Sequence, residues 1–220
     1  MKAVQIRRQD GGSALKRSAI VSAALEVFAR DGFSRARVED IAQAASVSTR
    51  TVYNHFQDKS ALFAAVVEIS ATATSHAYIA TIDGILGAVA DPDDLESALI
   101  SCAMALRESV PPEHPHWGLV RHLHADAAHV SVDVADTWRQ VGPARVNRQI
   151  ALHFSSLTLK GLLRLADPDA AAEHYIALIR STWGSEFEPR VTEEHSARQV
   201  ELAVRTFLYG YSTVPRDTGE

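Results

Sequence analysis

Histidines are concentrated between residues 114 and 129 of this 220-residue chain. Among them, His122 and His129 flank Asp126 at the spacing i, i+4, i+7, so a helix over this stretch would carry all three on one face. Two imidazoles and a carboxylate are a chemically sensible ligand set for zinc, nickel or iron, and His174 is a candidate for a fourth ligand. The alternative is a polar or half-buried face with a His–Asp hydrogen bond.

A second set of chemically capable residues lies near the N-terminus. Its members are compact hydrogen-bonding side chains: Ser48, Thr49, Arg50, Thr51, Asn54 and His55. Presented from one short helix, such side chains can hydrogen bond to base edges in the major groove of DNA. The alternative is the solvated face of a plain helical hairpin.

The elements that would position these residues have the period of helices. Residues 16–30 carry one apolar stripe and end at Asp31-Gly32, and short helices are expected over 38–45 and from Ser48, a suitable N-cap, to His55. Asp58 suits the N-cap of a fourth helix from Lys59. We expect a small apolar core that holds these helices together, made of Ala24, Phe28, Val38, Ile41, Ala42, Val47, Val52 and Phe56.

The remaining two thirds of the chain also lack strand alternation. Asp91-Pro92 and Asp167-Pro168 each place an acidic cap before a proline at the first helical position, where no N–H is missed. We therefore predict an all-α protein of about nine helices.

Charge and composition narrow the class of protein. Residues 1–64 carry ten lysines and arginines against six acids, a balance of +4, whereas the rest carries 12 against 21, a balance of −9. A basic N-terminal part (residues 1–64, here called the head) attached to an acidic remainder indicates that the head alone binds a polyanionic partner. No stretch approaches the ~20 continuous apolar residues of a membrane helix, and residues 1–14 lack the apolar segment of an export signal. With Cys102 as the single cysteine, we expect a cytoplasmic protein without membrane contact.

Three motifs stand in a fixed order between residues 28 and 63. They read FARDGF (28–33), IAQAASVS (41–48) and TVYNHF (51–56), and Asp58-Lys59 and Leu62-Phe63 follow them. Over about 45 residues the chain thus resembles the TetR family of transcriptional regulators, at the end of its helix one, its helix two and turn, and its recognition helix running into helix four. The resemblance implies that Tyr53 and Lys59 contact phosphates and that residues 48–51, 54 and 55 contact bases or backbone.

The chain departs from the family pattern at two places. Ser46 stands where the family usually has a glycine in the turn, and a serine fits only if that residue avoids or tolerates a positive φ. Arg37 stands where a serine or threonine usually caps helix two and contacts a phosphate. It can still reach a phosphate but cannot cap, so this helix start should be weaker by about 1 kcal/mol.

The resemblance beyond residue 63 lies in helix order, and it implies an effector pocket and a homodimer interface. The residues expected to line the pocket are Trp117, His122, Asp126, Trp138, Phe154, His174 and Tyr175. The residues expected in the interface lie on the last two helices: Ile179, Trp183, Val200, Val204, Phe207, Leu208 and Tyr211. For both sets the alternative is packing in the core of the chain itself.

We therefore predict a bacterial, ligand-responsive repressor rather than an enzyme. A flexible arm (residues 1–15), a three-helix helix-turn-helix domain (16–58), a larger helical ligand-binding and dimerisation domain (59–213) and a tail (214–220) are expected. Its partners would be a palindromic double-stranded DNA operator, a small-molecule effector and a second copy of the chain. No cofactor is required, although a divalent metal could bind in the sensor pocket. The alternatives are a helical metal-dependent enzyme and a protein-binding adaptor.

Overall fold

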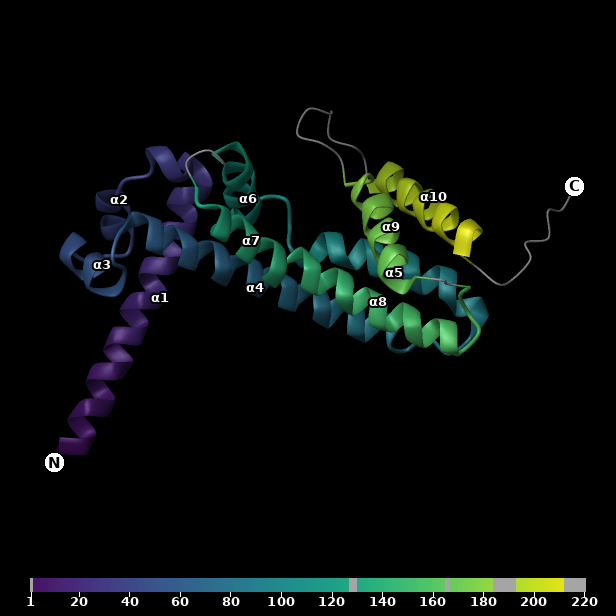
Figure 1. Cartoon of the computed structure of the whole chain (residues 1–220), viewed down its shortest axis with the longest axis horizontal. Coiled ribbons are helices and arrows are strands. Elements are labelled where there is room, and N and C mark those ends of the chain that lie inside the picture. The colour runs from purple at the N-terminus through teal and green to yellow at the C-terminus, as the bar shows by residue number, and fades with distance from the viewer. Residues whose placement is uncertain (1, 127–129, 165–166, 184–192, 212–220) are drawn as a thin grey trace, which may run out of the picture. The chain divides into compact units, whose positions relative to one another are not determined.

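A computed structural model describes residues 2–126, 130–164, 167–183 and 193–211, and these residues form ten helices (Figure 1). The all-α class is confirmed. The bounds of the helices are Lys2–Arg35 (α1), Val38–Ala44 (α2), Thr49–His55 (α3), Lys59–Leu86 (α4), Pro92–Ser109 (α5), Pro115–Ala125 (α6), Val132–Val141 (α7), Pro143–Leu159 (α8), Pro168–Arg180 (α9) and Glu193–Tyr211 (α10).

The helices group into two compact units. Unit 1 comprises Met1–Thr74 and Pro112–Gly142, and unit 2 comprises Ser75–Pro111 and Pro143–Glu220. Helix α4 contributes its first half to unit 1 and its second half to unit 2. These units differ from the expected domains, because α6 and α7 join the helix-turn-helix instead of the second domain.

Side-chain caps start the helices where the sequence predicts them. Each cap is a short-range interaction in which an oxygen accepts a backbone N–H that has no partner within the helix. The oxygen–nitrogen distances are 2.7 Å for Asp58 and Ala61, 3.0 Å for Asp91 and Asp93, and 3.0 Å for Asp167 with both Asp169 and Ala170. The predicted caps at these three aspartates are confirmed.

Helix α1 begins at Lys2, well before residue 16, so the segment expected to be a flexible arm is helical from Lys2 onward. Residues 2–9 contain strong helix formers and no proline, which favours this extension. The helix is interrupted where the sequence indicates, because Gly32 takes φ 77° and ψ 172°. Residues with a Cβ rarely adopt this conformation.

The core of unit 1 holds α1, α2, α3 and α4 together. Seven of the eight predicted core residues are buried, and Val47 is half-buried against them. Phe63 of α4 lies at the centre, with its ring 4.9 Å from that of Phe28 and 5.0 Å from that of Phe33. Leu119 and Leu123 of α6 complete the same core.

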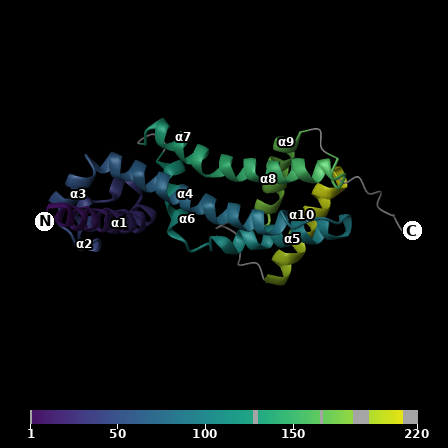
Figure 2. The ribbon, with the colours of Figure 1, turned by 90° about the horizontal axis from the view of Figure 1, so that it is seen from below.

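The core of unit 2 is aromatic. The rings of Phe154 on α8, Tyr175 on α9 and Phe207 on α10 pack against one another, with centroids 5.3 to 5.7 Å apart. The Tyr175 hydroxyl donates to the Leu99 carbonyl of α5 at 2.7 Å. Figure 2 shows α9 and α10 running steeply across α5 and α8, so this cluster ties four helices together.

Helix α4 is the one helix within the described ranges that is long and apolar enough to cross a membrane. Its apolar side chains, however, enter the cores of the two units: Leu62, Phe63, Val66, Val67, Ile82 and Leu86 are at most 2% exposed. The apolar character of α4 is therefore explained by packing.

Candidate nucleic-acid interface

The turn between α2 and α3 closes through backbone hydrogen bonds. The N–H of Ser46 donates to Gln43 at 3.0 Å, and the N–H of Val47 donates to Ala42 at 2.9 Å. Ser46 takes φ 54° and is the one residue other than glycine with a positive φ in the described part of the chain. The serine therefore tolerates the left-handed conformation, at a cost of about 1–2 kcal/mol.

Helix α3 is anchored on one side and exposed on the other. Ser48 caps it as predicted, because its Oγ accepts the N–H of Thr51 at 3.1 Å and lies 2.9 Å from the Thr51 hydroxyl. Val52 and Phe56 are buried in the core of unit 1. Since these two residues lie four apart on one face, the opposite face of α3 points to solvent.

The residues expected to bind DNA lie at accessible positions on α2, α3 and α4. Five of them are exposed: Arg37, Ser48, Arg50, Tyr53 and Asn54. Four are half-buried: Thr49, Thr51, His55 and Lys59. The structure thus brings the predicted set together around the helix-turn-helix and presents hydroxyl, amide and guanidinium groups to solvent.

One further cation joins this surface from outside the motif. Arg17 of α1 is exposed, and its guanidinium lies 5.1 Å from the ring centre of Phe56, directly after α3. We did not identify Arg17 from the sequence, because nothing in its local pattern shows that α1 passes the end of α3. A guanidinium held over an aromatic ring keeps its charge for a nearby phosphate.

Arg37 starts α2 without capping it, as predicted. Its backbone is extended, with φ −110° and ψ 138°, and its side chain makes no capping hydrogen bond. The guanidinium instead lies 3.7 Å from the Glu39 carboxylate, and both side chains are well exposed. Such an exposed pair contributes little to stability, so Arg37 remains available to another anion.

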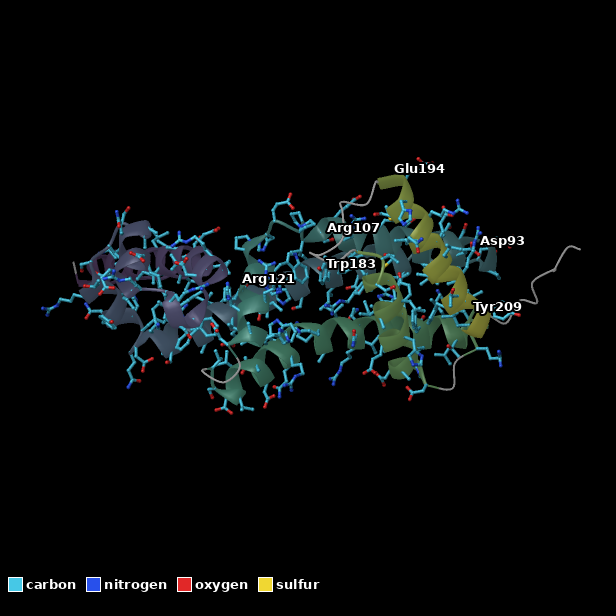
Figure 3. The ribbon with its side chains drawn as sticks, turned by 90° about the horizontal axis from the view of Figure 1, so that it is seen from above. Asp93, Arg107, Arg121, Trp183, Glu194 and Tyr209 are labelled. Carbon is cyan, nitrogen blue, oxygen red and sulfur yellow. The ribbon has the colours of Figure 1, made fainter. Side chains whose placement is uncertain are left out.

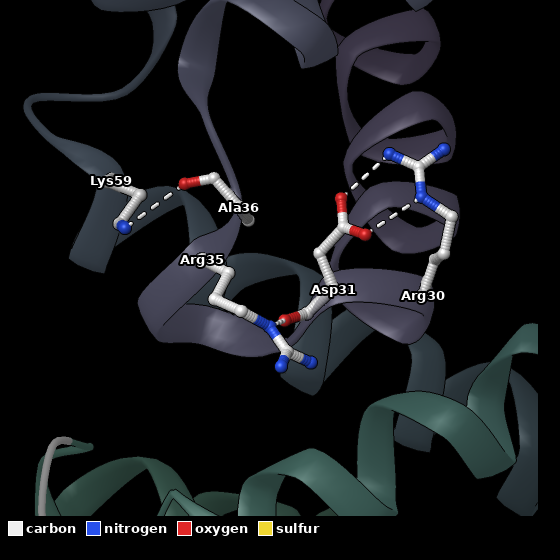
Figure 4. Close-up of polar contacts among 5 residues, drawn as sticks. All are labelled: Arg30, Asp31, Arg35, Ala36 and Lys59. Atoms are coloured by element: carbon white, nitrogen blue, oxygen red, sulfur yellow. Dashed lines mark hydrogen bonds and ion pairs between the residues drawn. The ribbon is translucent and has the colours of Figure 1, made fainter.

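Three cationic side chains make polar contacts at the end of α1 and in the turn that follows it. Lys59 Nζ donates to the Ala36 carbonyl at 3.2 Å, and Arg35 Nε donates to the Asp31 carbonyl at 3.0 Å (Figure 4). The Arg30 guanidinium donates to both Asp31 carboxylate oxygens, at 2.9 and 2.7 Å. This hydrogen bond lowers the pKa of Asp31.

The expected pocket residues divide between the two units. Trp117, His122, Asp126 and Trp138 belong to unit 1, and Phe154, His174 and Tyr175 to unit 2. Phe154 and Tyr175 are fully buried in the aromatic core, which is the alternative that the sequence left open. His174 is exposed, and Trp117 is half-buried beside His116, with the ring centres 5.1 Å apart.

Only part of the expected metal-binding face lies among the described residues. Helix α6 ends at Ala125 with Asp126 as its C-cap, and His129 lies outside the described residues. His122 and Asp126 both lie against Gly32 of α1, because a Cβ built there would be 2.8 Å from His122 Nδ1 and 3.0 Å from Asp126 Oδ2. No group of three or more potential ligands that could hold a metal occurs within the described ranges.

The residues expected in a dimer interface mostly lie inside unit 2. Ile179, Val200, Val204, Phe207 and Leu208 are at most 4% exposed in the single chain. Trp183 is half-buried, and the side chain of Tyr211 lies outside the described part. These apolar stripes are explained by packing within the chain.

The exposed apolar residues of α10 lie elsewhere on the helix. Leu202 is 49% exposed and Tyr209 is 77% exposed. Figure 3 shows Tyr209 near the end of α10 opposite to Glu194. Since Leu202 and Tyr209 lie seven residues apart, they share one face.

Two family models match the chain. Residues 20–66 match the model of bacterial regulatory proteins of the tetR family. Residues 110–213 match the C-terminal domain of AefR-like transcriptional repressors. The first match contains α2, α3 and most of the candidate interface. No curated protein matches the sequence significantly.

Solved structures of transcriptional regulators share the fold. A protein from Mesorhizobium loti MAFF303099, assigned to the TetR family, is 27% identical over 91% of this chain and 98% of its own, with a TM-score of 0.80. SmeT, the repressor of the Stenotrophomonas maltophilia multidrug efflux pump SmeDEF, is 21% identical over 93% and 96%, with a TM-score of 0.60. A regulator from Saccharomonospora viridis in complex with choline is 19% identical over 88% and 95%, with a TM-score of 0.59.

These matches separate the chain from the helical enzymes and adaptors that the sequence left open. The solved structures described above are all of transcriptional regulators. The helix-turn-helix lies within the first family match, and the second covers most of the remaining helices. The chain belongs to the TetR family of bacterial transcriptional regulators.

Proposed function

We propose that this regulator is a sequence-specific repressor that leaves its operator when a small molecule binds. The observation that carries the proposal is the exposed polar face of α3, held by Val52 and Phe56 on the core of unit 1. A short helix fixed in this way can enter the major groove of DNA, while the preceding helix lies across the backbone. Such a protein acts where the DNA is, which in a bacterium is the cytoplasm.

Two kinds of contact to DNA are assigned to different side chains. Arg50 and Asn54, exposed on α3, have the donors and acceptors that read guanine and adenine edges. Tyr53 and Arg37, also exposed, are assigned to phosphates, which position the protein without reading sequence. Ser48, Thr49, Thr51 and His55 offer shorter polar groups to either part of the DNA.

Buried polar atoms without partners support an effector site in unit 2. The hydroxyl of Tyr78, Nε1 of Trp183 and Oγ of Ser196 are buried and have no hydrogen-bond partner among the described residues. Burial raises the pKa of Tyr78 to about 12, so its hydroxyl stays a neutral donor. An unpaired buried donor costs about 1–3 kcal/mol, which a ligand with acceptor oxygens would recover. In unit 1, Nε1 of Trp138 is unpaired in the same way.

The fold relatives also support regulation by a small molecule. One of them is the repressor of a multidrug efflux pump, and another was solved in complex with choline. For this chain we propose an effector that accepts hydrogen bonds. It can act only through a difference in its affinity for the two states of the protein, typically worth about 1–3 kcal/mol.

A homodimer on a palindromic operator completes the proposal. Leu202 and Tyr209 form an exposed apolar pair on one face of α10, a position suited to a second copy. Two heads would then meet two half-sites about 34–36 Å apart, or a multiple of this spacing. A small change in the distance between the heads would end simultaneous binding.

The test uses the DNA upstream of the chain's own gene. The wild-type chain should shift this DNA at low salt, and Tyr53→Ala should weaken binding to every sequence by a similar factor. Glu68→Ala, an exposed change on α4, is the control. Wild-type affinity in Tyr53→Ala would remove α3 from the interface.

The effector site has a test of its own. Small carbonyl- and carboxylate-bearing compounds are screened for release of the DNA, and the compound that releases it is titrated against Tyr78→Phe. We expect an unchanged or higher stability of the free variant and an effector affinity lower by about tenfold. Equal affinity in both proteins would place the effector elsewhere.

A further inference from the structure

Lys59 lies against the turn between α1 and α2, although it is the first residue of α4. Its Nζ is 3.2 Å from the Ala36 carbonyl and 3.4 Å from the Ser34 carbonyl. The same nitrogen is 4.7 Å from the ring centre of Phe33, and the side chain is half-buried. Two of the three N–H donors of the ammonium therefore face backbone carbonyls of this chain.

The turn lies between the end of α1 and the start of α2, where some backbone N–H and C=O groups have no hydrogen-bond partner within their own helix. The last carbonyls of a helix have no intrahelical donor, and a cation close to them is favourable. At the end of α1, Arg35 donates a hydrogen bond to the Asp31 carbonyl and Lys59 donates one to the Ser34 carbonyl. On the other side of the turn, α2 starts at Arg37 without a side-chain cap.

The same lysine fixes how α2 begins. Ala36 is 4% exposed, and its N–H donates to the Gly32 carbonyl at 3.2 Å. With the Ala36 carbonyl held by Lys59, both polar groups of this residue are engaged within unit 1. The first turn of α4 thereby holds the residue directly before Arg37, which is the proposed phosphate contact at the start of α2.

We propose that Lys59 is a positioning residue: it clamps the turn between α1 and α2 and so sets α2 for DNA binding, in place of the phosphate contact that the family resemblance implies. The inference rests on the proposed DNA-binding function. Lys59 does not replace the missing cap at Arg37, because a serine or threonine cap would accept an N–H of α2. It donates instead to the Ala36 carbonyl and so orders the backbone just before this helix.

The test compares two variants that each replace a cation by methionine. Lys59→Met keeps the apolar stem over Phe33 but removes the donors, and Arg37→Met removes the proposed phosphate contact. DNA affinity is measured for each over a series of salt concentrations, well below the unfolding temperature. A lost phosphate contact reduces the salt slope by about 0.9 per site. We expect this reduction for Arg37→Met, and for Lys59→Met an affinity about tenfold lower with the wild-type slope.

Amide hydrogen exchange in the free protein provides the second readout. Lys59→Met should exchange faster than wild type over residues 38–44 of α2, by about tenfold, whereas Lys59→Arg should restore both the affinity and the exchange rates. If Lys59→Met does not fold, Lys59→Leu, which also lacks N–H donors, is used in its place. A shallower salt slope with unchanged exchange would make Lys59 a direct phosphate contact and overturn the proposal. If wild type bound no DNA, the proposed function would fail, while the exchange data would still test the clamp.

Discussion

The backbone of Gly118 on α6 lies directly against the carbonyl of Ala29 on α1. A Cβ built on Gly118 would be 2.6 Å from the Ala29 oxygen and 3.1 Å from its Cβ. Helix α6 therefore packs on the first helix of the helix-turn-helix at a distance that only glycine permits. Because α6 lies this close to α1, Leu119 and Leu123 of α6 are buried in the core of unit 1.

Gly118→Ala should destabilise the protein by about 1–3 kcal/mol, because the clash is with backbone that cannot move aside cheaply. Gly84→Ala is the matched control, since Gly84 is also helical but has nothing within 4 Å of a built Cβ. The control should be neutral or stabilise by up to about 1 kcal/mol. Urea unfolding measures both variants, and equal stabilities would mean that α6 does not approach α1 in this way.

Ser46→Gly should stabilise the turn before α3. Relief of the left-handed strain at φ 54° is worth about 1–2 kcal/mol, and the greater freedom of glycine in the unfolded chain costs about 0.5–1 kcal/mol. We expect a net gain of about 0.5–1 kcal/mol in thermal unfolding. Ser46→Ala, which keeps the Cβ, should show no gain; a similar gain in both variants would contradict a backbone origin.

Acid should destabilise the protein through His116. This residue is 4% exposed, its Nδ1 is 2.9 Å from the Ser70 hydroxyl, and burial lowers its pKa from 6.5 to about 4. Because the folded state disfavours protonation, the unfolded chain binds more protons in this window, and stability falls as the pH drops from about 6.5 to 4.

Urea unfolding at two pH values measures the effect. Between pH 7 and pH 5 the wild type should lose about 2 kcal/mol more than His116→Leu. His76→Leu, a change at an exposed histidine of α4, should keep the wild-type dependence. If His116→Leu also kept the wild-type pH dependence of stability, titratable groups other than His116 would cause the acid sensitivity.

Two charge insertions on α10 distinguish the core from the proposed dimer interface. Val204 is fully buried, so Val204→Glu should unfold unit 2 instead of producing folded monomers, because it buries an unpaired charge. Leu202, which is 49% exposed, should accept Leu202→Glu without loss of helicity but yield a monomer. Sedimentation velocity measures the oligomeric state of each variant, and circular dichroism measures its helicity. A folded dimer of Leu202→Glu would place the interface away from this face.

Features that depend on neighbouring residues were predictable from the sequence. Ser48 and Asp58 cap helices through bonds to residues three positions later, and the spacing of Ala24 and Phe28 reflects the geometry of a single helix, α1. The apolar stripe at Val204 and Phe207 indicated burial, but a stripe does not state whether the same chain or a second copy covers it. The contacts of Lys59 and Gly118 join residues 23 to 89 positions apart, and no local pattern reports such a distance.

The most direct test of the central claim is the base preference of α3. Duplexes selected from a random pool by the wild-type chain should contain a palindrome, bound at least about a thousandfold more tightly than a scrambled duplex at the same salt concentration. Arg50→Ala and Asn54→Ala should each relax the preference at their own position of the half-site, at a cost of about 1–3 kcal/mol. Equal affinity for selected and scrambled duplexes, or an unchanged preference in both variants, would contradict sequence reading by this helix.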